Sequence, residues 1–167
     1  MLPDNDAKRI LNEMDLKKPP HILYHTQVAS LTGAIRQYNL SWAINDYLKI
    51  HLQACVVEMG AELSCLRRQM KNNSNDWINF DLNKVIKLGN QYIPWGKKER
   101  NYVCNLTDHS WFNNIPFNKE NGVIVAAGVL HYLKYEDVKN LLKVLCIWHC
   151  FISTRSEERR VGKECRS

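Results

Sequence analysis

The segment that most constrains the fold of this chain is ACVVEMGAELSCLRR, residues 54–68. It opens with an apolar run at residues 55–57, which ends at an acid, Glu58, and a glycine, Gly60. A strand buried on both faces of a parallel sheet reads as such a continuous apolar run. The glycine lets backbone approach a ligand, and the acid can accept hydrogen bonds from hydroxyl or amine groups. The segment therefore predicts a buried parallel strand whose carboxyl end faces a nucleotide-sized ligand.

Further apolar runs predict more strands, with helical patterns between them. The predicted strands lie at residues 55–58, 77–80, 101–104 and 123–127. Apolar residues at spacings of three and four predict helices from residue 30 onward and at 64–70, 82–92 and 136–146. Because strands and helices alternate, we expect an α/β fold with a doubly wound parallel sheet built from right-handed crossovers.

The first helical region carries a stripe of large apolar side chains, which we expect to be buried in the core. This stripe consists of Leu31, Ala34, Ile35, Tyr38 and Trp42. Ser41 is expected to cap a second helical segment. Arg36 lies among these residues and has two interpretations. It is either a solvated helix arginine or a guanidinium reserved for a ligand carboxylate, which it would clamp in bidentate fashion.

Each predicted strand is followed by a small or polar residue, and in parallel sheets ligands bind outside the carboxyl ends of the strands. Asp81 follows Glu58 by 23 residues, close to the spacing at which an acid meets a ribose diol. Each residue also has a local explanation, as a turn glycine, a helix cap or a surface amide. Their order along the chain favours a common site, which comprises Glu58 and Gly60, Asp81, Asn105 and Leu106, and Ala127 followed by Gly128 and His131.

The last residues of the chain, RSEERRVGKECRS at 155–167, resemble the translation of a sequencing-adapter oligonucleotide, and we expect them to be an artefactual tail outside the fold. Without their five basic and three acidic residues the formal net charge falls from +6 to +4. That small excess is spread along the chain, so we expect no nucleic-acid partner.

The composition, with 45% hydrophobic and 24% charged residues, is typical of an ordinary globular protein. Five cysteines remain without Cys165, and they lack C-x-x-C spacing, which indicates reduced thiols. Cys146, His149 and Cys150 have no partner pair elsewhere, so we expect no metal site.

No apolar run approaches 18 residues, and the N-terminus is too acidic for a signal peptide. We therefore expect a cytoplasmic protein that does not enter a membrane.

Four stretches of this chain resemble successive motifs of class I S-adenosylmethionine-dependent methyltransferases. They are VVEMGAELSCLRR, WINFDLNKVI, NYVCNLTDHSWF and GVIVAAGVLHYL, and the resemblance covers residues 30–145. The nearest group is that of leucine carboxyl methyltransferase-like proteins, which includes polyketide O-methyltransferases. The resemblance implies S-adenosylmethionine as cofactor and transfer of its methyl group to a carboxylate or hydroxyl of a small molecule or peptide.

The same resemblance implies roles for individual residues. Glu58, Gly60 and Ala61 match the first motif and would line the methionine portion of the cofactor, while Glu62 replaces a glycine of that motif. Asp81 matches the acid that holds the ribose hydroxyls. The other implied cofactor-binding positions are Asn105 and Leu106 near the adenine, Ala127 where the family often has a glutamate, and Arg36 at the cofactor carboxylate.

The catalytic machinery is less defined by the sequence. The sulfonium is already an activated methyl donor, so the main tasks are alignment and exclusion of water. A carboxylate acceptor needs no base, whereas a hydroxyl acceptor does, and His131 is the candidate. The favoured interpretation of His131 is a variable position without a role. An alternative function is a non-catalytic interaction module with this fold, which Glu62 and Ala127 favour. An NAD-dependent oxidoreductase is excluded because no G-x-G-x-x-G occurs.

The family's sheet has more strands than the four predicted here. We therefore expect an N-terminal arm at residues 1–29, a C-terminally truncated methyltransferase domain at 30–154, and no activity of the isolated chain. Residues 146–154 could begin a fifth strand or could already be disturbed sequence.

Overall fold

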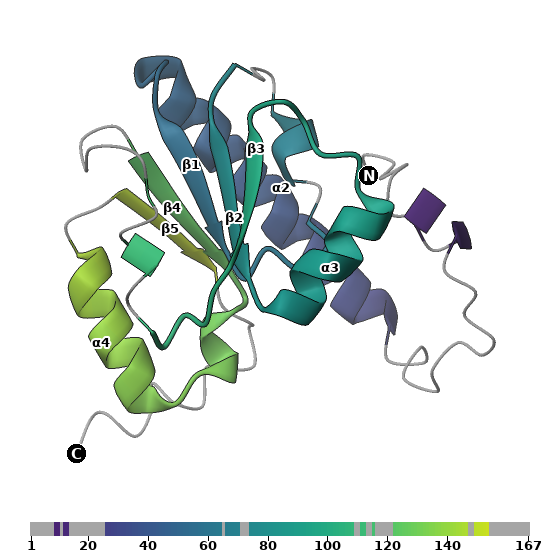
Figure 1. The fold of residues 1–167 in the computed structure, drawn as a ribbon. Helices are drawn as coiled ribbons and strands as arrows, with labels where there is room; N and C mark the ends of the chain where they lie inside the picture. Colours follow the sequence, from purple (N-terminus) through teal and green to yellow (C-terminus); the bar gives the residue numbers. More distant parts are fainter. Residues whose placement is uncertain are drawn as a thin grey trace.

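In a computed structural model the chain forms a parallel α/β sheet flanked by helices (Figure 1). The structure describes residues 9–10, 12–13, 26–64, 66–70, 74–108, 111–112, 115, 122–146 and 149–153. The tail expected at 155–167 and most of the arm expected at 1–29 lie outside these residues, as does Cys65.

The described strands form one five-stranded sheet in the order β3-β2-β1-β4-β5, and every neighbouring pair is parallel. All four predicted strands are confirmed to within two residues at each end, and a fifth follows them. The strands are β1 (Cys55–Met59), β2 (Trp77–Asp81), β3 (Glu99–Val103), β4 (Gly122–Ala127) and β5 (His149–Ser153). The chain adds β2 and β3 on one side of β1, then β4 and β5 on the other. The strand order therefore reverses between β1 and β4, and ligands bind at such a switch point.

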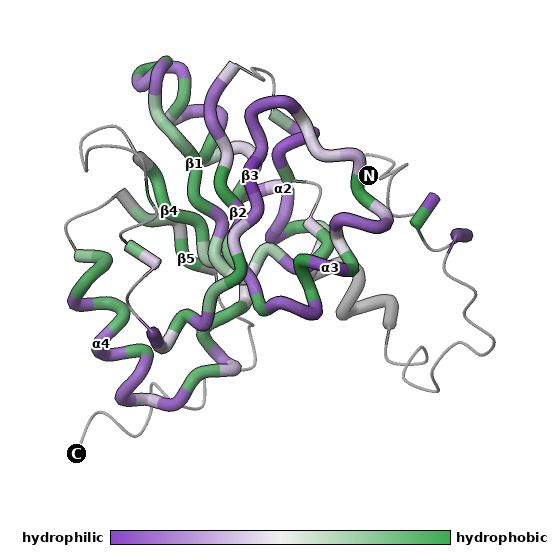
Figure 2. The backbone as a smooth tube through the Cα atoms, in the orientation of Figure 1, coloured by the Kyte–Doolittle hydropathy of each residue, from purple (hydrophilic) through white to green (hydrophobic). Residues whose placement is uncertain are grey.

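Two apolar clusters cover the two faces of the sheet. On one face, the long helix α2 (Thr26–Ile50) packs Leu40, Ile44 and Leu48 against side chains of β1, β2 and β4. On the other face, α4 (Tyr135–Leu145) packs Leu141 and Leu145 against the opposite side of the same strands. Burying these large side chains supplies most of the driving force for folding. Figure 2 shows the hydrophobic colour concentrated along β1 and β4, with a more hydrophilic β3 at the edge.

Three short helical elements complete the described fold. The helix α3 (Asn83–Tyr92) follows β2 and leads into β3, while η2 (Leu66–Gln69) and η5 (Leu130–Tyr132) are single 3-10 turns. The helix predicted at residues 64–70 is therefore a 3-10 turn, which is short because its residues must cross to β2 within a few positions. No helix among the described residues is long and apolar enough to cross a membrane.

Two expectations about the first helix are wrong. Ser41 does not cap a second segment, because α2 runs unbroken from Thr26 to Ile50 and the Ser41 hydroxyl donates back to the carbonyl of Tyr38 at 2.9 Å. The predicted core stripe is also misplaced, since Tyr38 and Trp42 are 60% and 63% exposed. The apolar residues at helical spacing form two stripes on α2, and the sheet covers the stripe that contains Leu40, Ile44 and Leu48.

Candidate functional site

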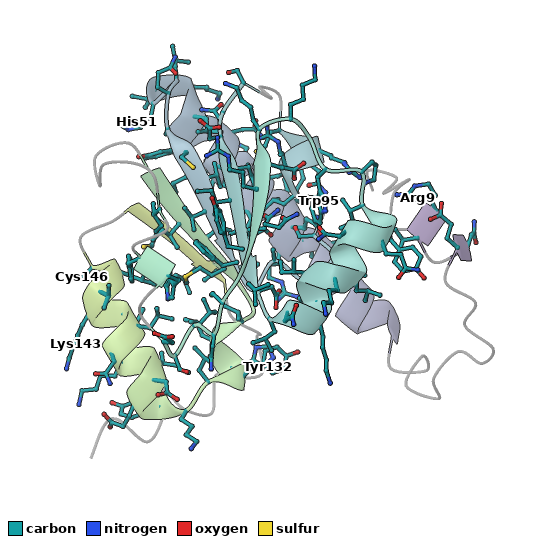
Figure 3. All side chains as sticks on the ribbon, in the orientation of Figure 1. Arg9, His51, Trp95, Tyr132, Lys143 and Cys146 are labelled. Atoms are coloured by element: carbon teal, nitrogen blue, oxygen red, sulfur yellow. The ribbon has the colours of Figure 1, made fainter. Side chains whose placement is uncertain are left out.

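A cavity of about 290 Å³ lies at the carboxyl ends of β1 and β4, against α2. The labelled side chain of Tyr132 marks this end of the sheet in Figure 3. The cavity is lined from α2 by Gly33, Arg36, Gln37 and Leu40, from β1 and the turn after it by Glu58, Gly60, Ala61, Glu62, Leu63, Ser64 and Leu66, and from β4 by Ala127. Six of the sequence-predicted site residues therefore surround one cavity: Arg36, Glu58, Gly60, Ala61, Glu62 and Ala127.

Glu58 lines this cavity from the carboxyl end of β1, a strand that is buried along its whole length. Its side chain is 3% exposed. Burial raises the pKa of Glu58 from 4.5 to about 7, because the charged form loses its hydration. Hydrogen bonds from Ser64 and Trp77 act in the opposite direction and hold the pKa lower than burial alone would. Glu58 is thus a carboxyl group whose charge changes near neutral pH.

The turn after β1 lines the cavity and begins at Gly60. Gly60 has φ +63°, a backbone conformation that favours glycine. An added Cβ would also lie 2.7 Å from the Cβ of Val129, so there is no space for a side chain. The Gly60 N–H donates to the carbonyl of Phe80 at 2.8 Å, which ties this turn to the end of β2.

Glu62 continues the turn in a left-handed conformation, with φ 51°. Non-glycine residues rarely adopt such a backbone, which explains why a glycine is expected here. Its N–H donates to Asp81 Oδ2 at 2.7 Å, and the N–H of Leu82 donates to Asp81 Oδ1, also at 2.7 Å. Asp81, the last residue of β2, therefore holds the strained turn through the N–H of Glu62, which itself lines the cavity. Each carboxylate oxygen still has a second lone pair for another donor.

The end of β4 gathers a second group of side chains. Gly128 has φ +76°, and an added Cβ would lie 2.5 Å from Arg36 Nη1 and 3.9 Å from His131 Cε1. The guanidinium of Arg36 thus crosses from α2 to rest on Gly128 beside His131. Both ring nitrogens of His131 are buried, and neither has a hydrogen-bond partner among the described residues. The imidazole packs on the ring of Tyr132 with centroids 3.9 Å apart.

The end of β3 does not line the cavity. Asn105 is exposed, and its Oδ1 accepts hydrogen bonds from the N–H and hydroxyl of Thr107 at 3.1 and 3.0 Å. Leu106 is 7% exposed and belongs to the core cluster with Phe80 and Trp111. Both side chains therefore have local structural tasks, as a turn former and as a core residue.

Sequence reasoning named Arg36 but missed other lining residues, including Gly33, Gln37, Leu40 and Ser64. Gly33, Gln37 and Leu40 lie three, one and four positions from Arg36, so they share one helix face with it. That face could have been recognised from Arg36 alone. Ser64 carries no comparable signal, because a serine after a glycine turn is common.

Comparison with known proteins identifies what this arrangement resembles. No family model matches the chain. It is 26% identical over 103 residues to the tetracenomycin polyketide synthesis O-methyltransferase TcmP of Streptomyces glaucescens, which covers 61% of this chain and 37% of that protein. The chain thus spans well under half the length of this curated relative.

Solved structures share the fold. The methyltransferase domain of bacterial CtHen1 has a TM-score of 0.56 at 13% identity, covering 73% of this chain and 67% of the other. The plantazolicin methyltransferase BpumL, solved with SAH and a triazolic desmethylPZN analog, has a TM-score of 0.55 at 12% identity, covering 98% and 59%. Human N-acetylserotonin methyltransferase, solved with SAM, has a TM-score of 0.50 at 13% identity, covering 86% and 45%. The resemblance indicated by the motifs is therefore confirmed: the chain is similar to class I S-adenosylmethionine-dependent methyltransferases, by sequence to a polyketide O-methyltransferase and by fold to the solved enzymes.

Proposed function

We propose that the cavity between α2 and the carboxyl ends of β1 and β4 binds S-adenosylmethionine, and that the protein to which this chain corresponds is an O-methyltransferase. The observation that carries the proposal is the pairing of one cation, Arg36, and one buried acid, Glu58, across a single cavity beside a glycine turn. The amino-acid portion of the cofactor has one carboxylate and one ammonium group, which complement this pair.

The size of the cavity supports the assignment of that portion. Ligand pockets usually measure roughly 300–1,000 Å³, so 290 Å³ holds an amino-acid group more readily than a whole nucleoside. Arg36 would clamp the carboxylate, Glu58 would accept from the ammonium, and the backbone at Gly60 and Ala61 would line the chain between them. Asp81, which borders the cavity through Glu62, would accept from the ribose hydroxyls.

The adenine end fits less well. Asn105 and Leu106 would hold the adenine only if the base lay over the end of β3, outside the cavity. Asn105 keeps its amide N–H₂ and a second lone pair for such a contact, whereas Leu106 could offer only the exposed remainder of a core side chain. Glu62 adds a negative charge at the cavity wall, and Ala127 provides no polar group there.

When bound, the cofactor supplies an activated methyl group. The chain's own residues then orient the donor and exclude water from it. His131 is placed beside Arg36 with two unpartnered ring nitrogens, so it would accept the proton of a hydroxyl acceptor. A carboxylate acceptor would not need it. The acceptor is proposed to be a small molecule or peptide bearing one of these groups.

A second candidate function is a non-catalytic module that keeps the fold without the cofactor. Glu62 and Ala127 favour it, since both depart from residues that would assist binding. The Glu62→Gly variant separates the two functions. A gain in affinity for S-adenosylhomocysteine (SAH) favours a weakened enzyme site, whereas absence of binding by both proteins favours the module.

The test of the proposed function is a calorimetric titration of the chain with SAH. We expect saturable binding, and Arg36→Gln should weaken it about 10-fold or more, because a charge-assisted hydrogen bond is lost. Lys139→Gln is the matched control, since Lys139 lies on α4 and is 51% exposed. Equal affinities of the two variants, or no binding by the chain and by Glu62→Gly, would refute the assignment.

A further inference from the structure

A row of polar side chains crosses the buried face of the sheet and ends at the cavity. Glu58, Asn79 and Asn101 occupy paired positions on β1, β2 and β3. The side-chain amide of Asn79 donates to Asn101 Oδ1 at 2.9 Å, and Asn79 is 3% exposed. Polar groups buried on an otherwise apolar face are costly unless they are hydrogen-bonded, so this row requires an explanation.

Within this row, Trp77 links Glu58 to Asn79. Its indole N–H lies 2.9 Å from Asn79 Oδ1 and 3.3 Å from Glu58 Oε2, so two acceptors share one proton. Trp77 is 1% exposed, and the guanidinium carbon of Arg67 lies over its ring, 5.8 Å from the centroid. Because the indole is buried, its N–H is confined to these two acceptors.

We propose that Trp77 is a positioning residue that holds the Glu58 carboxylate at the cavity and stabilises its charged form, while Asn79 limits this effect by competing for the same N–H. The importance of this arrangement for cofactor binding rests on the function proposed above, in which charged Glu58 meets the ammonium group. The arrangement itself exists without the cofactor.

The charged groups around Glu58 influence whether its carboxyl group is neutral or charged. Burial is the main cause that raises its pKa to about 7, and Glu99 on β3 and Asp81 on β2 also raise it. Ser64 and Trp77 lower it by donating hydrogen bonds. Arg36 and Glu62 line the same cavity with opposite charges. Because the resulting pKa lies near neutrality, the loss or gain of one donor changes which form of Glu58 predominates.

Two substitutions should act in opposite directions. Trp77→Phe keeps an aromatic ring but removes the N–H, so the pKa of Glu58 should rise by about one pH unit. Asn79→Leu keeps the approximate shape of the amide but removes the competing acceptor. The indole then donates to Glu58 alone, and the pKa should fall by about half a pH unit. A merely structural disturbance would admit water to both variants and lower the pKa in both.

The experiment is a pH titration of ¹³Cδ-glutamate signals by NMR in the free chain, with Glu58→Gln used to assign the Glu58 signal. Circular dichroism establishes that each variant is folded. If Trp77→Phe does not fold, benzothienylalanine at position 77 keeps both rings and lacks the donor. Shifts in opposite directions support the proposal, and shifts in the same direction or no shift overturn it.

A parallel titration with SAH at several pH values distinguishes this proposal from the proposed function. Affinity for SAH should be lost as the pH falls and Glu58 becomes neutral. In Trp77→Phe the pH at which half of this affinity is lost should rise together with the pKa of Glu58. If the wild-type chain does not bind SAH, the cofactor assignment fails, while the NMR titration still decides the role of Trp77.

Discussion

Replacing Glu58 by glutamine should stabilise the fold, by an amount that depends on pH. The pKa of Glu58 is about 7 in the folded chain, above its ordinary value of 4.5, so the folded state holds a proton that the unfolded state has released. The stability that Glu58 contributes is fully present below pH 4.5 and is lost as pH rises through 7. Relative to its value at low pH, the stability is therefore lower by about 3 kcal/mol at pH 8 and by about 1 kcal/mol at pH 5.

Glu58→Gln removes this titration while keeping the size of the side chain. The variant should gain about 2 kcal/mol relative to the wild type between pH 5 and pH 8. The free energy of unfolding from urea melts at several pH values measures this difference. Comparing one variant at two pH values cancels any fixed effect of packing the amide. A difference that does not change with pH would refute the claim that Glu58 is a buried, titrating carboxyl group.

Three other outcomes follow from the same region. Gly60→Ala should destabilise the fold by about 2 kcal/mol or more in urea melts, because the left-handed turn and Val129 leave no room for a methyl group; Gly33→Ala, which meets no atom within 4 Å, is the control and should not destabilise. Glu62→Gly should raise the melting temperature and stabilise by up to about 1 kcal/mol, since it relieves a left-handed backbone; a loss of stability would contradict this reading. Affinity for SAH in calorimetric titrations should fall as pH drops below about 7, where Glu58 becomes neutral; a constant affinity between pH 6 and pH 8 would count against its contact with the ammonium group.

The sheet could be predicted because its signals are local. Strands β1 and β4 are continuous apolar runs, and only a strand buried on both faces requires such a run. Their carboxyl ends had to meet at one edge once the strands were parallel, so Glu58 and Ala127 could be placed together from the sequence. Strand β5 was left open because its residues, 149–153, include His149 and Cys150 and lack that pattern.

The orientation of α2 could not be predicted in the same way. The helix carries apolar side chains on two faces, and periodicity does not say which of them meets the sheet. The buried stripe runs through Leu40, Ile44 and Leu48, while Tyr38 and Trp42 lie on the exposed face. Only the position of the sheet decides between the two, and that position depends on residues far along the chain.

The site was predictable where it depends on strand ends and less so where it depends on long-range packing. Sequence reasoning offered Arg36 as a possible carboxylate ligand, but it could not show that the guanidinium reaches Gly128 from another element. The hydrogen bonds that Trp77 donates to Glu58 and Asn79 were not foreseen, because a tryptophan that begins a strand reads simply as a core residue.

The strand order also has a consequence for how the chain emerges from the ribosome. Val57 pairs with Ile78 on one side and with Ile124 on the other, so one edge of β1 must wait for β4 to be synthesised. Helix α2 contacts β5, which begins 99 positions after α2 ends. Strand pairings between residues so distant in sequence form slowly. Until β4 pairs with it, the second edge of β1 stays exposed. A nascent chain of this kind needs protection from aggregation until β4 and β5 have joined the sheet.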